Sequence, residues 1–206
     1  INPITGKWMT KSWNIDNLLP EALETYLSIE KTLNIKILNE IPIRRYFLNI
    51  NDLDRAKKRI KNPRYSTYIN KINSYNEGPS VLKDSYGSIE ISKGCWINLP
   101  LLLSHLEIFF LSKNLYVESY FDPNRLTKNG SSNRWEYDNL SSKNVIFCQG
   151  IHSLRNKYFS SLPIIPIKGE ILSLKLNNVN IPNGIYYKKK WLIAENDSEN
   201  NDTYKL

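Results

Sequence analysis

The stretch from Asn144 to Ser153 contains residues that suit contact with a cofactor. Its sequence is Asn-Val-Ile-Phe-Cys-Gln-Gly-Ile-His-Ser, in which four apolar residues lead to a glycine at position 150. This pattern predicts a buried strand, a tight turn at Gly150 and the start of a short helix. At such a turn the backbone can approach a phosphate or a cofactor closely. An ordinary buried strand and turn would give the same pattern, so both interpretations stay open.

Arg45 is a second candidate, because it is a cation among apolar side chains. In the predicted strand over 41–50, alternation places Ile41, Ile43, Arg45 and Phe47 on one face and Arg44 on the other. A buried guanidinium requires an anionic partner. That partner is either a substrate carboxylate bound through two hydrogen bonds or, as the favoured alternative, a structural ion pair such as one with Glu170.

Other familiar catalytic patterns are missing. His105 and His152 lack the cysteine or carboxylate spacing of a zinc site, so no metal is expected. Cys95 and Cys148 lie in apolar neighbourhoods without Cys-x-x-Cys spacing, which predicts buried free thiols in a reducing cytoplasm. No Gly-x-Ser-x-Gly elbow, Walker loop or His-Glu-x-x-His pattern occurs, which argues against hydrolases, nucleotidases and metalloproteases.

Helices and strands that could position these residues follow from the hydrophobic periodicity. Helices are predicted over 16–33 and 52–61, and a third over 98–112 is apolar around most of its circumference, so it is expected to be buried. The predicted strands are 35–38, 41–50, 86–91, 115–121, 134–137, 167–176 and 185–194. This order predicts an α+β fold with a mostly antiparallel sheet flanked by helices and one parallel-looking unit near 98–150.

Composition sets limits on the class of protein. The chain has 206 residues, 41% hydrophobic and 23% charged, which is typical of a globular protein. No apolar run approaches the roughly 18 residues of a membrane span, and a cytoplasmic location is expected. The net charge of +8 comes from scattered lysines without an RNA-binding motif, so it supports only non-specific attraction to phosphate. Nucleic acid is therefore a minor alternative as a partner.

Three segments carry a resemblance to a known enzyme family: Asn2-Pro-Ile-Thr-Gly-Lys7 with Lys11-Ser-Trp13 and Leu18-Leu-Pro20, then Val145-Ile-Phe-Cys-Gln-Gly150, then Leu162-Pro-Ile-Ile-Pro-Ile-Lys-Gly-Glu170. Together, and in this order, they resemble the FAD-dependent oxidoreductase superfamily of D-amino-acid oxidase, glycine oxidase and sarcosine oxidase. The Gly-x-Gly-x-x-Gly turn with which that superfamily holds the FAD pyrophosphate is absent from this sequence. The resemblance therefore implies the middle portion of such an enzyme.

The resemblance also implies a division of the chain. Residues 1–34 would be a loop and helix on the side of the cofactor domain. Residues 35–97 and 161–206 would form the two parts of a substrate-binding domain, and residues 98–160 would be part of a Rossmann-like FAD-binding domain.

Particular residues receive roles from the same resemblance. Contact with FAD would fall to Asn2, Pro3, Cys148, Gln149 and Gly150. Contact with the substrate would fall to Lys168, Glu170, Tyr187 and Trp191, although exposure at a strand start and packing within a sheet are ordinary alternatives for these four. Arg45 joins them as a substrate-binding candidate on the separate ground of its place among apolar side chains.

The activity implied is oxidation of a C–N bond of a small amine or amino acid, by hydride transfer to FAD. Two alternatives stay open. One is a binding module that resembles the substrate domain but has no flavin. The other is the oxidase half of an enzyme that modifies wobble uridine in tRNA.

Overall fold

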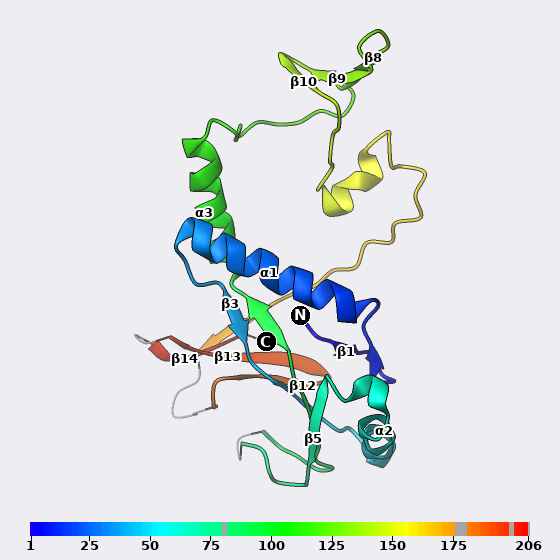
Figure 1. Cartoon of the computed structure of the whole chain (residues 1–206), viewed down its shortest axis with the longest axis vertical. Coiled ribbons are helices and arrows are strands. Elements are labelled where there is room, and N and C mark those ends of the chain that lie inside the picture. Colours follow the sequence, from blue (N-terminus) through cyan, green and yellow to red (C-terminus); the bar gives the residue numbers. More distant parts are fainter. Residues whose placement is uncertain (80–81, 176–180, 198–199, 206) are drawn as a thin grey trace. The chain divides into compact units, whose positions relative to one another are not determined.

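A computed structural model describes residues 1–79, 82–175, 181–197 and 200–205 (Figure 1). The chain forms two compact units, and each is described by itself. The first unit consists of Ile1–Lys113 with Ile171–Leu206, and the second of Asn114–Glu170.

A mixed sheet forms the centre of the first unit. Its strand order is β11-β14-β13-β12-β4-β6-β5. Every neighbouring pair is antiparallel except β12 and β4, which run parallel. The predicted α+β class with a mostly antiparallel sheet is confirmed. The strand bounds are β4 Ile43–Tyr46, β5 Ile69–Asn73, β6 Ser88–Ile91, β11 Ser173–Lys175, β12 Gly184–Lys188, β13 Lys190–Asp197 and β14 Asn200–Lys205.

The predicted single strand over 185–194 is in fact a tight hairpin. β12 and β13 pair antiparallel, with Lys188 opposite Lys190, so only Lys189 separates them. Lys189 has a φ of 63°, in the left-handed region that turns the chain back on itself. The turn itself is Lys188-Lys189-Lys190, with no Asn-Gly or Asp-Gly pair of the kind that usually indicates a hairpin, which is why it was not predicted.

Three helices accompany this sheet: α1 Ile15–Leu33, α2 Ile50–Ile60 and α3 Leu99–Ser112. The side chain of Asn49 caps α2 by accepting a hydrogen bond from the Asp52 N–H at 3.1 Å. Because this cap starts a helix at Ile50, the strand predicted over 41–50 ends at Tyr46. A short helix, η1, follows at Pro63–Tyr65.

The main core lies between the sheet and the first two helices. Ile43, Ile89 and Ile91 of the sheet pack with residues such as Leu19 of α1 and Ala56 of α2. Burial of each isoleucine or leucine side chain contributes about 1.5–3 kcal/mol to the free energy of unfolding. A smaller cluster contains Tyr46, Ile181, Tyr186 and Ala194. Two small sheets, β1 Ile4–Thr5 with β2 Thr10–Lys11 and β3 Leu38–Glu40 with β7 Cys95–Ile97, complete the unit.

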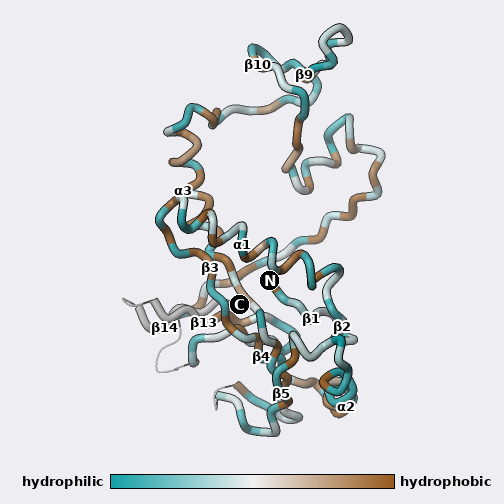
Figure 2. Tube along the Cα trace, viewed as in Figure 1, coloured by the Kyte–Doolittle hydropathy of each residue, from teal (hydrophilic) through white to brown (hydrophobic). Residues whose placement is uncertain are grey.

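Helix α3 is much more exposed than its composition predicts. Within its unit it contacts α1, and Leu102 is its buried residue. The exposed apolar residues are Leu99, Leu103, Ile108, Phe110 and Leu111. Figure 2 shows hydrophobic stretches, in brown, along α3. A helix that is apolar all round is buried only where other elements surround it, and α1 covers one side. No helix among the described residues is long and apolar enough to cross a bilayer.

The second unit contains a three-stranded antiparallel sheet. Its strands are β8 Thr127–Asn129, β9 Arg134–Tyr137 and β10 Leu140–Ser142, and the short helix η2 spans Gly150–Arg155. The strand predicted at 134–137 is confirmed. Those predicted at 115–121 and 145–148 do not form, because a strand requires a neighbour for its backbone hydrogen bonds and no described segment pairs with them.

Candidate functional site

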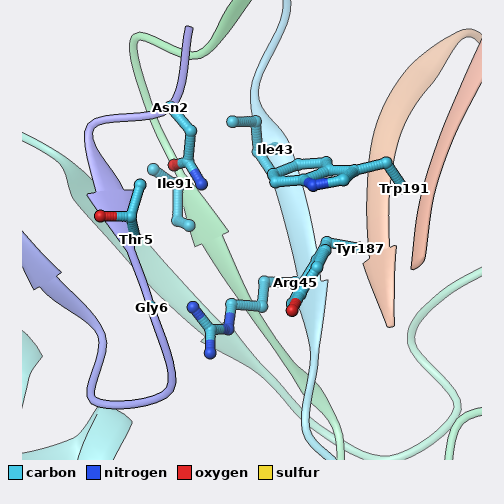
Figure 3. Close-up of a pocket in the computed structure, with 8 residues that line it drawn as sticks. All are labelled: Asn2, Thr5, Gly6, Ile43, Arg45, Ile91, Tyr187 and Trp191. Carbon is cyan, nitrogen blue, oxygen red and sulfur yellow. The ribbon is translucent and has the colours of Figure 1, made fainter. Parts of the chain in front are cut away.

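A pocket of about 160 Å³ surrounds Arg45 in the first unit. We call it the Arg45 pocket (Figure 3). Four of the predicted site residues, Asn2, Arg45, Tyr187 and Trp191, contribute to it. Its full lining is Asn2, Thr5, Gly6, Ile43, Arg45, Ile91, Tyr187 and Trp191.

Strand pairing brings three of these residues together. The parallel register of β4 and β12 places Arg45 opposite Tyr187. The hairpin then places Tyr187 opposite Trp191, with their ring centroids 4.7 Å apart. Since alternate residues of a strand face the same side, Ile43 lies beside Arg45 on this wall. The Arg44 guanidinium instead donates to the Glu77 carbonyl at 3.0 Å.

Arg45 is buried and has no described ion pair, although the charge of Asp52, which pairs with Arg55 at 2.9 Å, partly offsets the effect of burial on the pKa of Arg45. Arg45 is only 8% exposed, and its guanidinium lies 5.2 Å from the centroid of the Tyr187 ring. Among the described residues, no carboxylate lies within ion-pair distance of it. Burial lowers the pKa of Arg45, but a guanidinium stays protonated at any ordinary pH. The pocket therefore contains a desolvated positive charge.

The expected ion pair between Arg45 and Glu170 would join the two units, so it stays a prediction. Within the second unit, Glu170 pairs with Lys168 at 2.6 Å, and both side chains are largely exposed. The two residues are close neighbours in sequence, so their pairing requires no long-range packing. Their predicted role beside the substrate and flavin stays a prediction.

A loop at the start of the chain forms the other wall of the pocket. The Asn2 side-chain oxygen accepts from the Ile4 N–H at 3.0 Å, which leaves its amide nitrogen as a donor on the pocket side (Figure 3). The loop is held by Ser12, whose N–H donates to the Pro3 carbonyl at 2.9 Å and whose hydroxyl donates to the Asn2 carbonyl at 2.8 Å. Pro3 is fully buried. Gly6 has a φ of 70°, a conformation that favours glycine.

The remaining lining is apolar or aromatic, which defines what the pocket can bind. Ile43, Ile91, Tyr187 and Trp191 surround the guanidinium and the Asn2 amide. This combination suits a small anion with an apolar part. None of the eight lining residues is a carboxylate, histidine, cysteine or lysine. The pocket's own side chains therefore supply binding groups rather than a general base.

Thr5, Gly6, Ile43 and Ile91 also line the pocket but were not predicted as site residues, although alternation had placed Ile43 on the same face as Arg45. Thr5 and Gly6 could have been predicted, because they lie in the same loop as Asn2. No feature of the sequence indicates Ile91, because its place in the pocket depends on the pairing of β6 with β4, which puts it opposite Ile43.

The residues predicted to contact FAD in the second unit lie around the start of η2. Cys148 is exposed rather than buried, because the strand expected there does not form. Gln149 accepts from the Asn156 side chain at 2.8 Å. Gly150 has a φ of 52°, and a side chain added there would meet nothing within 4 Å. The backbone at Gly150 is open, its contact with FAD stays a prediction, and the glycine-rich loop for the pyrophosphate is absent from the sequence.

Comparison with known proteins supports the fold. The first unit is an α+β domain whose sheet carries a small cationic pocket. The chain is similar to the crystal structure of iminodiacetate oxidase (IdaA) from Chelativorans sp. BNC1, with a TM-score of 0.63 at 16% sequence identity. The match covers 96% of this chain and 58% of the oxidase, so the chain spans little more than half of that protein's length. No family model and no curated protein sequence matches.

Proposed function

We propose that this chain is part of an FAD-dependent oxidoreductase that acts on a C–N bond of a small amine or amino acid, and that the Arg45 pocket binds the carboxylate of the substrate. The observation that carries this proposal is the buried Arg45 without a described ion pair. The fold also supports the proposal, because it is shared with iminodiacetate oxidase. Iminodiacetate is an amine with two carboxylates.

Arg45 would act as the anchor for the anion. Its planar guanidinium can donate two parallel hydrogen bonds to one carboxylate, and burial strengthens such bonds. The Asn2 amide provides a further donor from the opposite wall. The Tyr187 ring packs against the Arg45 guanidinium, which fixes the direction in which the guanidinium N–H groups point.

The aromatic wall would orient the amine end of the substrate. Tyr187 and Trp191 form a pair of rings beside Arg45. A protonated amine is attracted to an aromatic face, and an uncharged amine with small alkyl groups packs against it. The carboxylate and the amine would therefore occupy opposite ends of the pocket.

A bound FAD would supply the acceptor for hydride. We propose that Asn2 contacts it from the loop of the first unit in which Pro3 is buried. For the second unit taken by itself, the contacts of Cys148, Gln149 and Gly150 with FAD, and the roles of Lys168 and Glu170 beside substrate and flavin, stay proposals from the resemblance. The contribution of the Arg45 pocket would be to bind and orient the substrate and to exclude water from it.

A pair of adjacent substitutions tests the anchor. Arg45→Met removes the buried cation and keeps much of its volume, whereas Arg44→Met makes the same change on the other face of β4. We expect Arg45→Met to weaken binding of glycine and N-methylglycine by about 10- to 100-fold, since a hydrogen-bonded charge contributes about 1.5–3 kcal/mol. Arg44→Met should change it less than about twofold. Binding is measured by isothermal titration.

Two controls define the outcome. Glycinamide, which lacks the carboxylate, should bind the original protein and Arg45→Met equally weakly. Urea melts establish that both variants are folded. If Arg45→Met binds glycine as tightly as the original protein, the carboxylate anchor is wrong.

The oxidoreductase itself requires a separate measurement. The protein is incubated with FAD and separated from free FAD, and its flavin spectrum is followed after an amino-acid substrate is added without oxygen. Retained flavin that is bleached by substrate supports the proposal. Carboxylate binding without any retention of FAD would favour the non-catalytic binding module.

A further inference from the structure

A second hollow lies beside the hairpin of β12 and β13, and we call it the lysine pocket. Because alternate residues of a strand face opposite sides, Tyr186 and Lys188 face away from the side on which Tyr187 lines the Arg45 pocket. The hollow has a volume of about 240 Å³. Its lining is Tyr46, Leu82, Lys83, Tyr186, Lys188, Lys190, Trp191 and Leu192.

Positive charge is concentrated at this pocket. Three of the eight lining residues are lysines, Lys83, Lys188 and Lys190, and none is acidic. The Lys188 ammonium donates to the Lys83 carbonyl, which holds the two residues together. Among the described residues, none of the three lysines takes part in an ion pair.

The hairpin tip that carries two of these lysines is unfavourable by itself. Lys188 lies directly opposite Lys190, and like charges in that arrangement destabilise a sheet. Lys189, between them, has a φ of 63°, which costs energy for a residue with a side chain. A bound anion would offset the repulsion, so these features point to a ligand with negative charge.

Apolar groups form the floor of the pocket. Tyr46 and Tyr186 are buried, at 3% and 7% exposed, and Leu192 packs with them. A ligand that fills the pocket would therefore place an anionic group at the lysines and an uncharged part on these side chains.

We propose that the lysine pocket binds a small molecule with a phosphate or pyrophosphate group. Ammonium groups are point charges that donate in any direction, which suits the several oxygens of a phosphate. Three ammonium groups carry more positive charge than a single carboxylate needs to be neutralised. A nucleic-acid strand would need an extended basic track with stacked aromatic residues, whereas this hollow is small and concave.

Trp191 connects this proposal to an optical readout. It lines both the lysine pocket and the Arg45 pocket. A ligand at the lysines therefore changes the surroundings of the Trp191 ring, and its fluorescence reports binding. The Trp191→Phe variant identifies the share of the signal that comes from this residue.

The experiment titrates the full chain with inorganic pyrophosphate at physiological salt, followed by calorimetry and tryptophan fluorescence. The test variant is Lys188→Gln with Lys190→Gln. The matched control is Lys57→Gln with Lys58→Gln, which removes the same charge from exposed positions of α2. We expect the hairpin variant to bind at least tenfold more weakly and the control to change less than twofold. Arg45→Met should bind pyrophosphate like the original protein, which separates this site from the proposed substrate site.

Several results would overturn the proposal. These are no binding of pyrophosphate at millimolar concentration, equal loss in both double variants, or an unchanged affinity in the hairpin variant while thermal melts show it to be folded. Tighter binding of a single-stranded RNA than of pyrophosphate, with a steep dependence on salt, would assign the lysines to nucleic acid instead.

Discussion

The adjacent residues Arg44 and Arg45 differ in their hydrogen-bond partners and their burial. Arg44 donates to the Glu77 carbonyl, whereas Arg45 is buried beside Tyr187 in a pocket without an acidic residue. Alternation in the sequence was enough to separate their faces. It could not identify the partner of Arg45, because that depends on which distant segments pack against β4.

Tyr68 makes a prediction about pH. Its hydroxyl donates to the Asp16 carboxylate at 2.7 Å, and burial together with this bond raises the pKa of Tyr68 to about 12, from an ordinary 10.0. As the pH rises from 10 to 12, the unfolded chain loses this proton before the folded chain does. The free energy of unfolding should therefore fall over that window. Urea melts should give a shallower fall for Tyr68→Phe.

The control for this prediction is Tyr75→Phe. Tyr75 is 63% exposed, so its removal should leave the pH dependence of the unfolding free energy unchanged. Equal slopes for the original protein and Tyr68→Phe would contradict the assignment.

Among the elements, those with local signals were predictable. The helix predicted over 16–33 begins one residue earlier, at Ile15, and the strand predicted at 134–137 has the same bounds. The segment 115–121 was predicted as a strand from its composition, but composition does not provide a partner, and none of the described residues pairs with it. For the same reason the sequence suggested Tyr187 and Trp191 as site residues but not the hairpin that places them opposite each other.

The cap of α2 gives a prediction at this scale. Asn49 accepts from the Asp52 N–H, while the Asp52 side chain accepts from the Leu48 N–H at 3.0 Å. Asn49 is exposed, so its substitution removes little packing. Asn49→Ala should lower the free energy of unfolding by about 1 kcal/mol, and Asn49→Ser should retain most of it. Urea melts of the two variants provide the measurement, and similar losses would exclude a capping role.

For the whole molecule, the buried and exposed faces of α3 should contribute differently to the free energy of unfolding. Leu102 is 6% exposed and Leu103 is 63% exposed, although they are neighbours on one helix. In the chain of 206 residues, Leu102→Ala should lower the free energy of unfolding by about 2–5 kcal/mol and Leu103→Ala by less than about 0.5 kcal/mol. Leu103→Ala should also reduce self-association, measured by light scattering.

The same pair of variants can be compared in a longer protein that contains this chain. The oxidase with the similar fold is considerably longer than the match, and additional residues could cover α3. If they do, Leu103→Ala should lower the free energy of unfolding as much as Leu102→Ala does. An unchanged small cost would mean that the face stays open to solvent.

The parallel pairing of β4 with β12 also determines when the Arg45 pocket can exist. Arg45 leaves the ribosome before its partners Tyr187 and Trp191, which follow it by 142 and 146 residues. At about 5–20 residues per second, roughly 7 to 30 s pass before they emerge. During synthesis the edge of β4 that pairs with β12 therefore stays unpaired for this time, and an unpaired strand edge is a site where another strand can pair.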